Sequence, residues 1–264
     1  MGSNGKYFTM HLFDSHCHIQ DERMAGRIDE VIGRAKAAGV EHMLCCGTSE
    51  EDWYSVAALA GKYREIIPAF GLHPWYAGKR SERWMESLGK KLAEFPGAAV
   101  GEIGLDHALD ERNDTEQADV FTAQLKLARE LHRPVSIHCR KAWGDMMKIL
   151  EQQCGLPHGG AMHSFSGAGD LIPNLERLNV SLSFSGSITY DRNKRGRAAA
   201  AAVSENYLLI ETDSPDIPPL DIERGRNEPS NAVKVAEKIA EIRGRSVEET
   251  AKVTYNNTAR IFRL

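Results

Sequence analysis

The sequence predicts a single α/β domain folded as a (β/α)8 TIM barrel. Eight short apolar segments, typical of buried strands, alternate with helical patterns along the chain. The 264 residues match the usual size of such a barrel. No Gly/Ser-rich linker, composition break or internal repeat divides them. We therefore expect one barrel domain over residues 11–264, preceded by a flexible start over residues 1–10 whose first residues are small and polar.

Each expected strand is a short apolar run rich in β-branched, aromatic or small residues. In chain order the expected strands are residues 12–16, 42–46, 66–71, 98–103, 134–138, 160–164, 180–185 and 207–212. An open doubly wound sheet is the alternative arrangement, and it binds ligands at a switch point between strands. The closed barrel is favoured because reactive side chains follow several different strands, and a barrel gathers all strand ends around one mouth.

Amphipathic helices are expected between the strands. Ile28, Val31 and Ala35, for example, recur at the spacing of one helix face. The expected helices are residues 27–38, 53–63, 82–95, 115–131, the segments around 146–150 and 171–178, the alanine-rich run 198–202, and two further helices at the C-terminus. The last of these begins at Ser246, where Glu249 completes a capping-box pattern.

Composition limits the classes of function. The formal net charge is −4, whereas proteins that coat nucleic acid non-specifically are usually basic, so any contact with nucleic acid must be local. No apolar stretch approaches the length of a membrane span, so we expect no membrane partner. The five cysteines are odd in number and follow no secretory signal. Free thiols in a reducing, cytoplasmic compartment are therefore expected.

Six possible metal ligands lie at, or close to, the carboxyl ends of the expected strands. They are His16, His18, Glu102, His138, His163 and Asp213. Side chains at the carboxyl ends of parallel strands converge in space even when they are distant in sequence. Imidazole and carboxylate together are typical ligands of a two-metal hydrolytic centre. Any one of these residues could instead be an ordinary hydrogen-bonded polar residue, but the whole ordered set favours a metal centre.

The spacing assigns provisional roles. His16 and His18 are two residues apart, so on a strand they point to the same side and can hold one cation together. Glu102 can place one carboxylate oxygen on each of two cations. His138 and His163 can then complete a second site. Asp213 can bind a cation and accept a proton from water.

The chain resembles the TatD family of metal-dependent deoxyribonucleases, within the amidohydrolase-like metal barrels. The stretches that carry the resemblance run in family order from residue 12 to residue 262: Phe13-Asp-Ser-His-Cys-His, Gly71-Leu-His-Pro, Val100-Gly-Glu-Ile-Gly-Leu-Asp, Pro134-Val-Ser-Ile-His-Cys-Arg, His163-Ser-Phe-Ser-Gly, Ile210-Glu-Thr-Asp-Ser-Pro, Arg226-Asn-Glu-Pro and Asn257-Thr-Ala-Arg-Ile-Phe. Together they are highly specific, although each alone is not. The resemblance implies that the same six residues are the metal ligands. It also implies that Glu102 takes the bridging place that a modified lysine holds in many relatives.

Two departures from the family pattern bear on substrate preference. Trp75 stands where family members often have a second histidine after the His-Pro pair, and His107 follows Gly-Leu-Asp where an aromatic residue is common. Trp75 and Trp143 could stack on a base or simply pack against the protein. Trp75 and His107 are both expected on loops near the mouth, so these departures affect substrate choice more than metal binding.

Three other residues are expected near the centre, and two of them have alternative interpretations. His73 is expected near the substrate phosphate as a donor or acid; alternatively, it is a turn residue before a proline. Arg140 suits bidentate contact with phosphate oxygens, or a structural ion pair. Asp106 is expected to accept a hydrogen bond from a ligand histidine.

Two further segments carry polar residues without an assigned catalytic role. Asn227 is expected to cap a helix that has Pro229 in its first turn. The basic cluster Lys194, Arg195 and Arg197 is either a nucleic-acid rim or a solvated helix face.

Three functions follow in order of preference. The first is a hydrolase of DNA phosphodiesters, most simply an exonuclease on single-stranded or frayed ends, with two divalent cations (Zn, Mn or Mg), Asp213 as proton acceptor, and His73 and Arg140 on the phosphate. The second keeps the cations but cleaves a small-molecule amide, lactone or ester, because fold alone does not fix substrate. The third is a non-catalytic binding protein, which is disfavoured because Asp213 accompanies the full ligand set. The sequence leaves the oligomeric state open.

Overall fold

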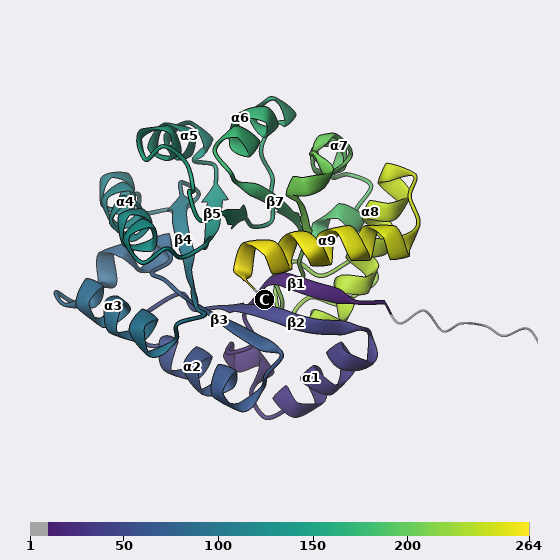
Figure 1. The fold of residues 1–264 in the computed structure, drawn as a ribbon, viewed down its shortest axis with the longest axis horizontal. Coiled ribbons are helices and arrows are strands. Elements are labelled where there is room, and N and C mark those ends of the chain that lie inside the picture. Colours follow the sequence, from purple (N-terminus) through teal and green to yellow (C-terminus); the bar gives the residue numbers. More distant parts are fainter. Residues whose placement is uncertain (1–9, 264) are drawn as a thin grey trace, which may run out of the picture.

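A computed structural model describes residues 10–263, and in it eight parallel strands form one barrel (Figure 1). The strands are β1 (Leu12–Cys17), β2 (Val40–Cys46), β3 (Ile66–Phe70), β4 (Ala99–Asp106), β5 (Val135–Arg140), β6 (Gly160–Met162), β7 (Ser181–Phe184) and β8 (Leu208–Ile210). Their order in the sheet is the order of the sequence, so every connection joins neighbours. The predicted flexible start at residues 1–10 falls on residues 1–9, outside the described residues, except for Met10.

Backbone hydrogen bonds join the two edge strands beyond the end of β8. The Asp213 amide donates to the His16 carbonyl at 3.0 Å, and the His18 amide donates to the Ser214 carbonyl at 2.7 Å. These bonds bring the β8 loop against β1, which closes the sheet at its carboxyl end. The (β/α)8 barrel is thus confirmed in preference to the open doubly wound sheet.

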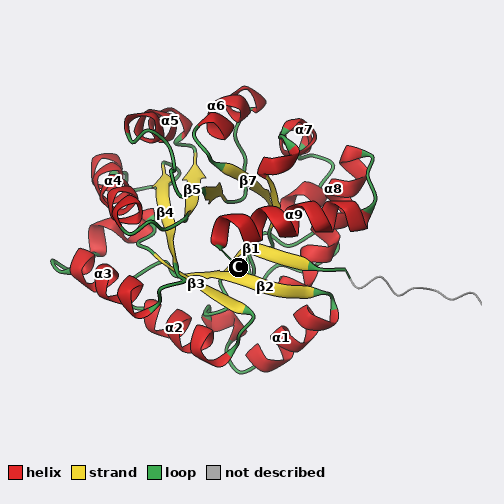
Figure 2. Cartoon of the chain, in the orientation of Figure 1, coloured by secondary structure: helices red, strands yellow, loops and turns green. Residues whose placement is uncertain are grey.

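Nine helices of the described chain surround the barrel, as the red ribbons in Figure 2 show. They are α1 (Ile28–Ala37), α2 (Trp53–Lys62), α3 (Trp84–Glu94), α4 (Asp114–Glu130), α5 (Trp143–Gln152), α6 (Ile172–Arg177), α7 (Lys194–Ala202), α8 (Ala232–Arg243) and α9 (Val247–Phe262). In α1 the buried residues are Val31, Ile32 and Ala35, the apolar face that the sequence predicts. Within residues 10–263, no helix combines the length and the apolar character that crossing a membrane requires.

Helix α9 covers the amino-terminal end of the barrel. In Figure 1 it crosses the middle of the view, in front of the strands. Its residues Ile261 and Phe262 belong to a buried cluster with Phe13, Ala99 and Leu209, which lie near the starts of their strands. Burying these apolar side chains stabilises the closed end. The open mouth is therefore at the carboxyl ends of the strands.

Two strands run further toward that mouth than the sequence indicates. The prediction ended them at residues 103 and 138, but β4 continues to Asp106 and β5 to Arg140. Asp106 pairs with Arg140, and the His107 amide donates to the Arg140 carbonyl at 2.8 Å. The extension depends on pairing between the two strands, which a local pattern does not report. By contrast, β6 and β8 are only three residues long, so His163 and Asp213 follow them in loops.

The capping box predicted at the start of α9 is present. The Glu249 amide donates to Ser246 Oγ at 3.1 Å, and the Ser246 amide donates to Glu249 Oε2 at 3.2 Å. Ser246→Ala should lower the free energy of unfolding by about 1 kcal/mol, because it leaves a helix amide without its acceptor. Urea unfolding followed by circular dichroism measures this. Ser246→Thr keeps the acceptor oxygen and should cost less; equal losses from both variants would contradict the capping role.

Candidate metal centre

The structure brings all six predicted ligands together at the mouth of the barrel. His16 lies in β1, Glu102 in β4 and His138 in β5, while His18, His163 and Asp213 come directly or shortly after β1, β6 and β8. His16, Glu102, His163 and Asp213 are buried, and His18 and His138 are half-buried. Their donor atoms form overlapping groups whose members lie within 4.8 Å of one another. Side chains separated by up to about two hundred positions thus converge because strand ends converge.

Glu102 is at the centre of this cluster, and its two oxygens face different partners. Oε2 lies 3.4 Å from His16 Nε2 and 3.3 Å from His18 Nε2. Oε1 lies 3.0 Å from His138 Nδ1 and 2.8 Å from His163 Nε2. Asp213 Oδ1 joins the first group, 3.6 Å from His18 Nε2. The donors therefore divide into two sets that share one carboxylate.

His73 belongs to the second set. Its buried Nε2 lies 3.4 Å from Glu102 Oε1, and it forms a donor group with Glu102 and His138. Its Nδ1 accepts a hydrogen bond from the Trp75 amide at 3.2 Å, which starts the 3-10 helix η2 (Pro74–Lys79). The turn position and a place in the site are thus both observed. The sequence analysis did not identify His73 as a metal donor, since a single histidine before proline carries no ligand spacing.

The donor sets suit divalent cations in chemistry and in spacing. Each set combines imidazole nitrogens with carboxylate oxygens, the ligands that zinc and similar ions use in proteins. Four donors placed tetrahedrally at about 2.1 Å from a cation lie about 3.4 Å from one another. The donor distances around Glu102, from 2.8 to 3.4 Å, are close to this value. The residues present therefore fit divalent cations on either side of Glu102.

Neighbouring groups orient three of the histidines so that one nitrogen of each faces the centre. His16 Nδ1 lies 2.8 Å from Ser136 Oγ, and His18 Nδ1 lies 2.8 Å from the Cys46 carbonyl. His138 Nε2 lies 3.2 Å from Asp106 Oδ2, as the sequence analysis expected of Asp106. Such outer contacts fix the ring and the tautomer of a metal-binding histidine.

The electrostatics of the cluster differ among its histidines. Burial disfavours the charged forms of His18, His138 and His163, but the carboxylates beside them outweigh it and raise the pKa of each ring above its ordinary value. Burial lowers the pKa of His16 and of His73 to about 4, so both rings are neutral at pH 7. Burial alone would raise the pKa of Glu102, but the histidines around it, His163 foremost, outweigh burial and hold that pKa well below its ordinary value. Neutral imidazole and ionised carboxylate are the states in which these groups ligate a metal.

Glycines allow Glu102 to lie this deep between strands. A Cβ on Gly101 would come 2.8 Å from Ser136 Cβ, and one on Gly104 would come 2.0 Å from the His138 carbonyl oxygen. Gly104 also has a φ of +149°, a conformation that other residues rarely adopt. The pattern Gly-Glu-Ile-Gly is therefore required by the close approach of the strands around the Glu102 carboxylate.

The loop after β8 holds Asp213 in an uncommon conformation, with a φ of +52°. Asn227 donates to the Thr212 carbonyl at 2.8 Å and to the Asp216 carbonyl at 2.6 Å, and so clamps the two sides of Asp213. The prediction that Asn227 caps a helix is wrong. The residue that directly precedes the short helix η6 (Pro229–Asn231) is Glu228. The side-chain amide of the fully buried Asn227 donates to the loop carbonyls instead of capping the helix.

The rim of the mouth is polar and aromatic on the side of β3 to β5. Arg140 is exposed, and its Nη1 lies 3.8 Å from Asp106 Oδ2. Trp75 is 49% exposed and donates from Nε1 to the same Asp106 oxygen at 2.7 Å. Trp143 instead packs edge-on against Phe165, with ring centroids 5.1 Å apart, in agreement with the packing alternative.

The remaining sequence candidates lie outside the donor sets. His107 Nε2 lies 3.7 Å from Asp114 Oδ1, at the start of α4. Lys194, Arg195 and Arg197 form the first turn of α7, which begins four residues earlier than expected. Arg197 pairs with Asp191 at 2.6 Å, so its charge is already matched on the helix surface.

Asp106 contacts both Trp75 at the rim and His138 in the second donor set. A substitution at Asp106 therefore tests how that donor set is held in place. Asp106→Asn should weaken binding of the second cation by about 10- to 100-fold, because the amide no longer attracts the His138 N–H as a carboxylate does. Competition with a fluorescent chelator measures the affinity. Trp75→Phe removes only the second hydrogen bond to Asp106 and should have a smaller effect. Unchanged affinity in Asp106→Asn would contradict the orienting role.

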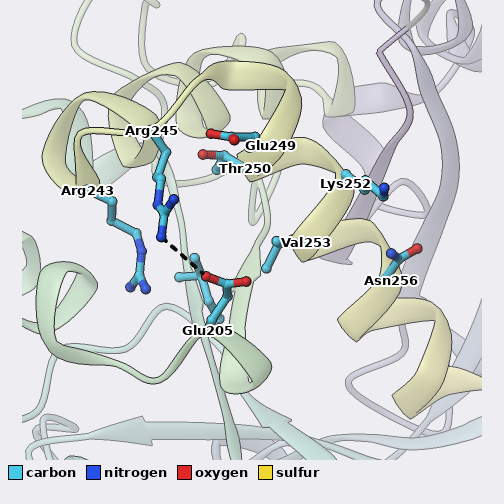
Figure 3. Close-up of a pocket in the computed structure, with 9 residues that line it drawn as sticks. Glu205, Arg243, Arg245, Glu249, Thr250, Lys252, Val253 and Asn256 are labelled. Carbon is cyan, nitrogen blue, oxygen red and sulfur yellow. Dashed lines mark ion pairs between the residues drawn. The ribbon is translucent and has the colours of Figure 1, made fainter.

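A second hollow, drawn in Figure 3, lies at the opposite end of the barrel. It has a volume of about 320 Å³ and lies between the start of β8, Glu205, and the beginning of α9. Arg245 faces Glu205 across it at 4.0 Å. It contains none of the predicted site residues.

Comparisons with known proteins agree with this geometry. The sequence model of the family "TatD related DNase" matches residues 13–263. An uncharacterized metal-dependent hydrolase, YabD of Bacillus subtilis, is 34% identical over 96% of this chain and 99% of its own length. The 3'-5' ssDNA/RNA exonuclease TatD of Cronobacter sakazakii is 31% identical over 95% of this chain and 97% of its own. The crystal structure of YjjV, a TatD homologue from Escherichia coli K12, superposes with a TM-score of 0.92 at 32% identity, covering 97% of this chain and 99% of that one.

Proposed function

Because this chain belongs to the TatD-related DNase family and is a metal-dependent hydrolase, we propose that it cleaves phosphodiester bonds of nucleic acid. The substrate we propose is single-stranded DNA or the frayed end of a duplex, cut from the end of the strand. The exonuclease TatD relatives, which carry a 3'-5' ssDNA/RNA activity in their names, support the choice of substrate class.

The observation that carries the proposal is the division of donors around Glu102. One carboxylate oxygen faces His16 and His18, and the other faces His138 and His163, at distances of 2.8 to 3.4 Å. We propose that the first set, with Asp213, holds one cation, and that the second set, with His73, holds another. When bound, such cations lower the pKa of water from about 15.7 toward 7 and offset charge on phosphate oxygens.

Asp213 is the proposed proton acceptor. Its Oδ1 lies 3.7 Å from His16 Nε2, so the carboxylate faces the centre where the attacking water must lie. The water oxygen forms a bond to phosphorus, the bond to the leaving ester oxygen breaks, and Asp213 accepts a proton from the water. The positive φ of Asp213 and the Asn227 clamp fix the direction of its side chain.

Arg140 and Trp75 are the proposed contacts on the β3 to β5 side of the rim. The exposed Arg140 guanidinium can donate two hydrogen bonds to a phosphate, and the exposed face of Trp75 can stack on a base. A small amide or lactone would instead call for a closed apolar pocket. The charged and aromatic rim therefore favours a nucleotide over the small-molecule alternative.

The donor chemistry also bears on the metal. The proposed sets contain five imidazoles, from His16, His18, His73, His138 and His163. Zinc and manganese accept imidazole nitrogen readily, whereas magnesium prefers oxygen and retains water. We propose zinc or manganese as the physiological ions, with magnesium acting only at a weak position.

Hydrolysis of end-labelled single-stranded DNA tests this function. The protein is stripped with a chelator, and Mn²⁺, Zn²⁺ and Mg²⁺ are added back singly. A metal-restored ladder of progressively shorter products supports an exonuclease and shows its polarity. Internal cleavage of long duplex at a comparable rate would contradict the strand-end preference. No cleavage by protein shown to hold its metals would favour a small-molecule ester or amide instead.

A further inference from the structure

A groove beside the metal centre is not used by the proposed mechanism. It has a volume of about 720 Å³ and lies among the loops that follow β1, β7 and β8. Its walls include Arg23, Tyr190, Arg192, Asn193, Asp216 and Arg224. A volume of about 300 to 1,000 Å³ is typical of sites that hold a small molecule or part of a larger one.

The wall of the groove is connected to the centre through the protein. Pro215, in its wall, is two residues after Asp213, and the Asp216 amide donates to the Asp213 carbonyl at 2.8 Å. Hydroxyl groups form a second connection between the centre and the groove. Ser164 follows His163 in the sequence, and its Oγ lies 2.9 Å from Ser185 Oγ. Ser185 Oγ in turn lies 3.4 Å from the Oγ of Ser187, which lines the groove. The groove therefore lies next to the centre.

Two arginines in the groove are available for an anion. Among residues 10–263, neither Arg192 nor Arg224 is in an ion pair, although each has an acidic neighbour in the sequence. Asp191 is paired with Arg197 at 2.6 Å, and Glu223 with Arg226 at 3.0 Å. The adjacent acids are thus already engaged.

The acidic residue that lines the groove is also paired. Asp216 accepts two hydrogen bonds from Arg23, at 2.9 and 2.7 Å. Arg23 also pairs with Asp21, so Arg23, Asp21 and Asp216 together carry one negative charge, against the two positive charges of Arg192 and Arg224, in a chain whose formal net charge is −4. Such a local positive site is what a mildly acidic protein needs in order to hold a polyanion.

The groove also offers an aromatic surface. The guanidinium of Arg192 lies 5.1 Å from the centroid of the Tyr190 ring, and Tyr190 is half-buried. Asn193, whose amide nitrogen donates to the Ser187 carbonyl at 3.1 Å, places polar groups beside that ring. Cations that follow a backbone, combined with an aromatic ring on which a base can stack, are the usual elements of a single-strand binding surface.

We propose that this groove binds the stretch of single-stranded polynucleotide next to the scissile phosphate. Arg192 and Arg224 contact backbone phosphates, and Tyr190 stacks on a base. The inference rests on the proposed nuclease function and adds the part of the substrate that the metal centre does not touch. It predicts that nucleotides beyond the scissile bond contribute to the affinity of the protein for the strand.

The test compares two double variants that change the net charge equally. Arg192→Ala/Arg224→Ala removes the groove cations, and Arg177→Ala/Arg245→Ala removes two exposed arginines near the opposite end of the barrel. Binding of fluorescein-labelled dT10 is followed by anisotropy in an Asp213→Asn background, so that the strand stays intact. Turnover of bis(4-nitrophenyl) phosphate, in proteins that retain Asp213, reports an intact centre without filling the groove.

The groove variant should raise the Kd for dT10 by about tenfold, and the control variant should not. The slope of log Kd against log salt should become shallower by about 1.4, the value for two lost contacts to a single strand. Tyr190→Ala should raise Kd by about tenfold through lost stacking, with the salt slope unchanged. Turnover of the small diester should stay at the wild-type value in every variant that retains Asp213.

Two outcomes would overturn the inference, and they can be told apart. If wild-type protein cleaves dT10 but the groove variant binds it as the control variant does, the groove is not the strand site and the nuclease function stands. If wild-type protein cleaves the small diester but neither binds nor cleaves dT10, the nucleic-acid function itself fails, and the groove inference fails with it.

Discussion

Glu102→Ala is expected to abolish hydrolysis, with a loss in kcat/KM of about 10⁴-fold or more, the scale for removing an essential catalytic group. The reason is geometric, because its Oε2 faces His16 and His18 while its Oε1 faces His138 and His163. Removal of this carboxylate takes one donor from each set at once. Elemental analysis of the purified variant should therefore show at most one cation per chain.

A matched variant separates charge from packing in this experiment. Glu102→Gln keeps the volume of the side chain but replaces one oxygen with an amide nitrogen that cannot ligate a cation. It should retain one donor set and lose the other, with thermal stability closer to wild type than that of Glu102→Ala. If Glu102→Ala held two cations and kept its activity, the bridging assignment would be wrong.

Asp213→Asn is expected to lower kcat by about 10³-fold or more while leaving the fold and the affinity for substrate intact. Asparagine has nearly the same shape but accepts no proton. It also tolerates the left-handed conformation at φ +52°, which alanine adopts less readily. Asparagine is therefore a cleaner test of the proton acceptor than alanine.

The control for Asp213 lies in the same loop. Asp221 is exposed and paired with Lys234, away from the donor sets. Asp221→Asn should leave kcat unchanged on DNA and on a small diester. Turnover of Asp213→Asn within tenfold of wild type on both substrates would rule out Asp213 as the proton acceptor.

Much of the fold could be predicted because its signals are local. Strand candidates such as residues 66–71 and helix candidates such as residues 53–63 are recognised from apolar runs and from helical spacing, and the structure has β3 and α2 there. The ends of β4 and β5 were underestimated because Asp106 and Arg140 are held in the sheet by pairing with each other. That pairing is a tertiary effect, and a single-strand pattern does not contain it.

The gathering of the site was predictable from one rule, that parallel strand ends meet at one mouth. The rule brings Glu102 and His163 to the same place, and the structure has them 2.8 Å apart. It does not say which oxygen of Glu102 faces which histidine, or that His73 faces the same carboxylate. Asn227 was misassigned for the same reason, since its carbonyl partners lie 11 and 15 residues earlier in the same loop, at distances that no sequence spacing identifies.

The groove was beyond sequence analysis because its charge balance depends on contacts between loops. Arg192 and Arg224 are two of many arginines in the sequence, and nothing local separates them from Arg197 or Arg226. Only the structure shows that Asp191 and Glu223 are paired elsewhere.

The central claim is that two cations, bridged by Glu102, are needed for hydrolysis of a phosphodiester. The most direct measurement is a titration of stripped protein with Mn²⁺ or Zn²⁺, in which bound metal is counted by native mass spectrometry and DNA hydrolysis is assayed in the same samples. We expect two equivalents to bind, with activity rising only as the second is taken up. Full activity with a single cation bound would contradict the account.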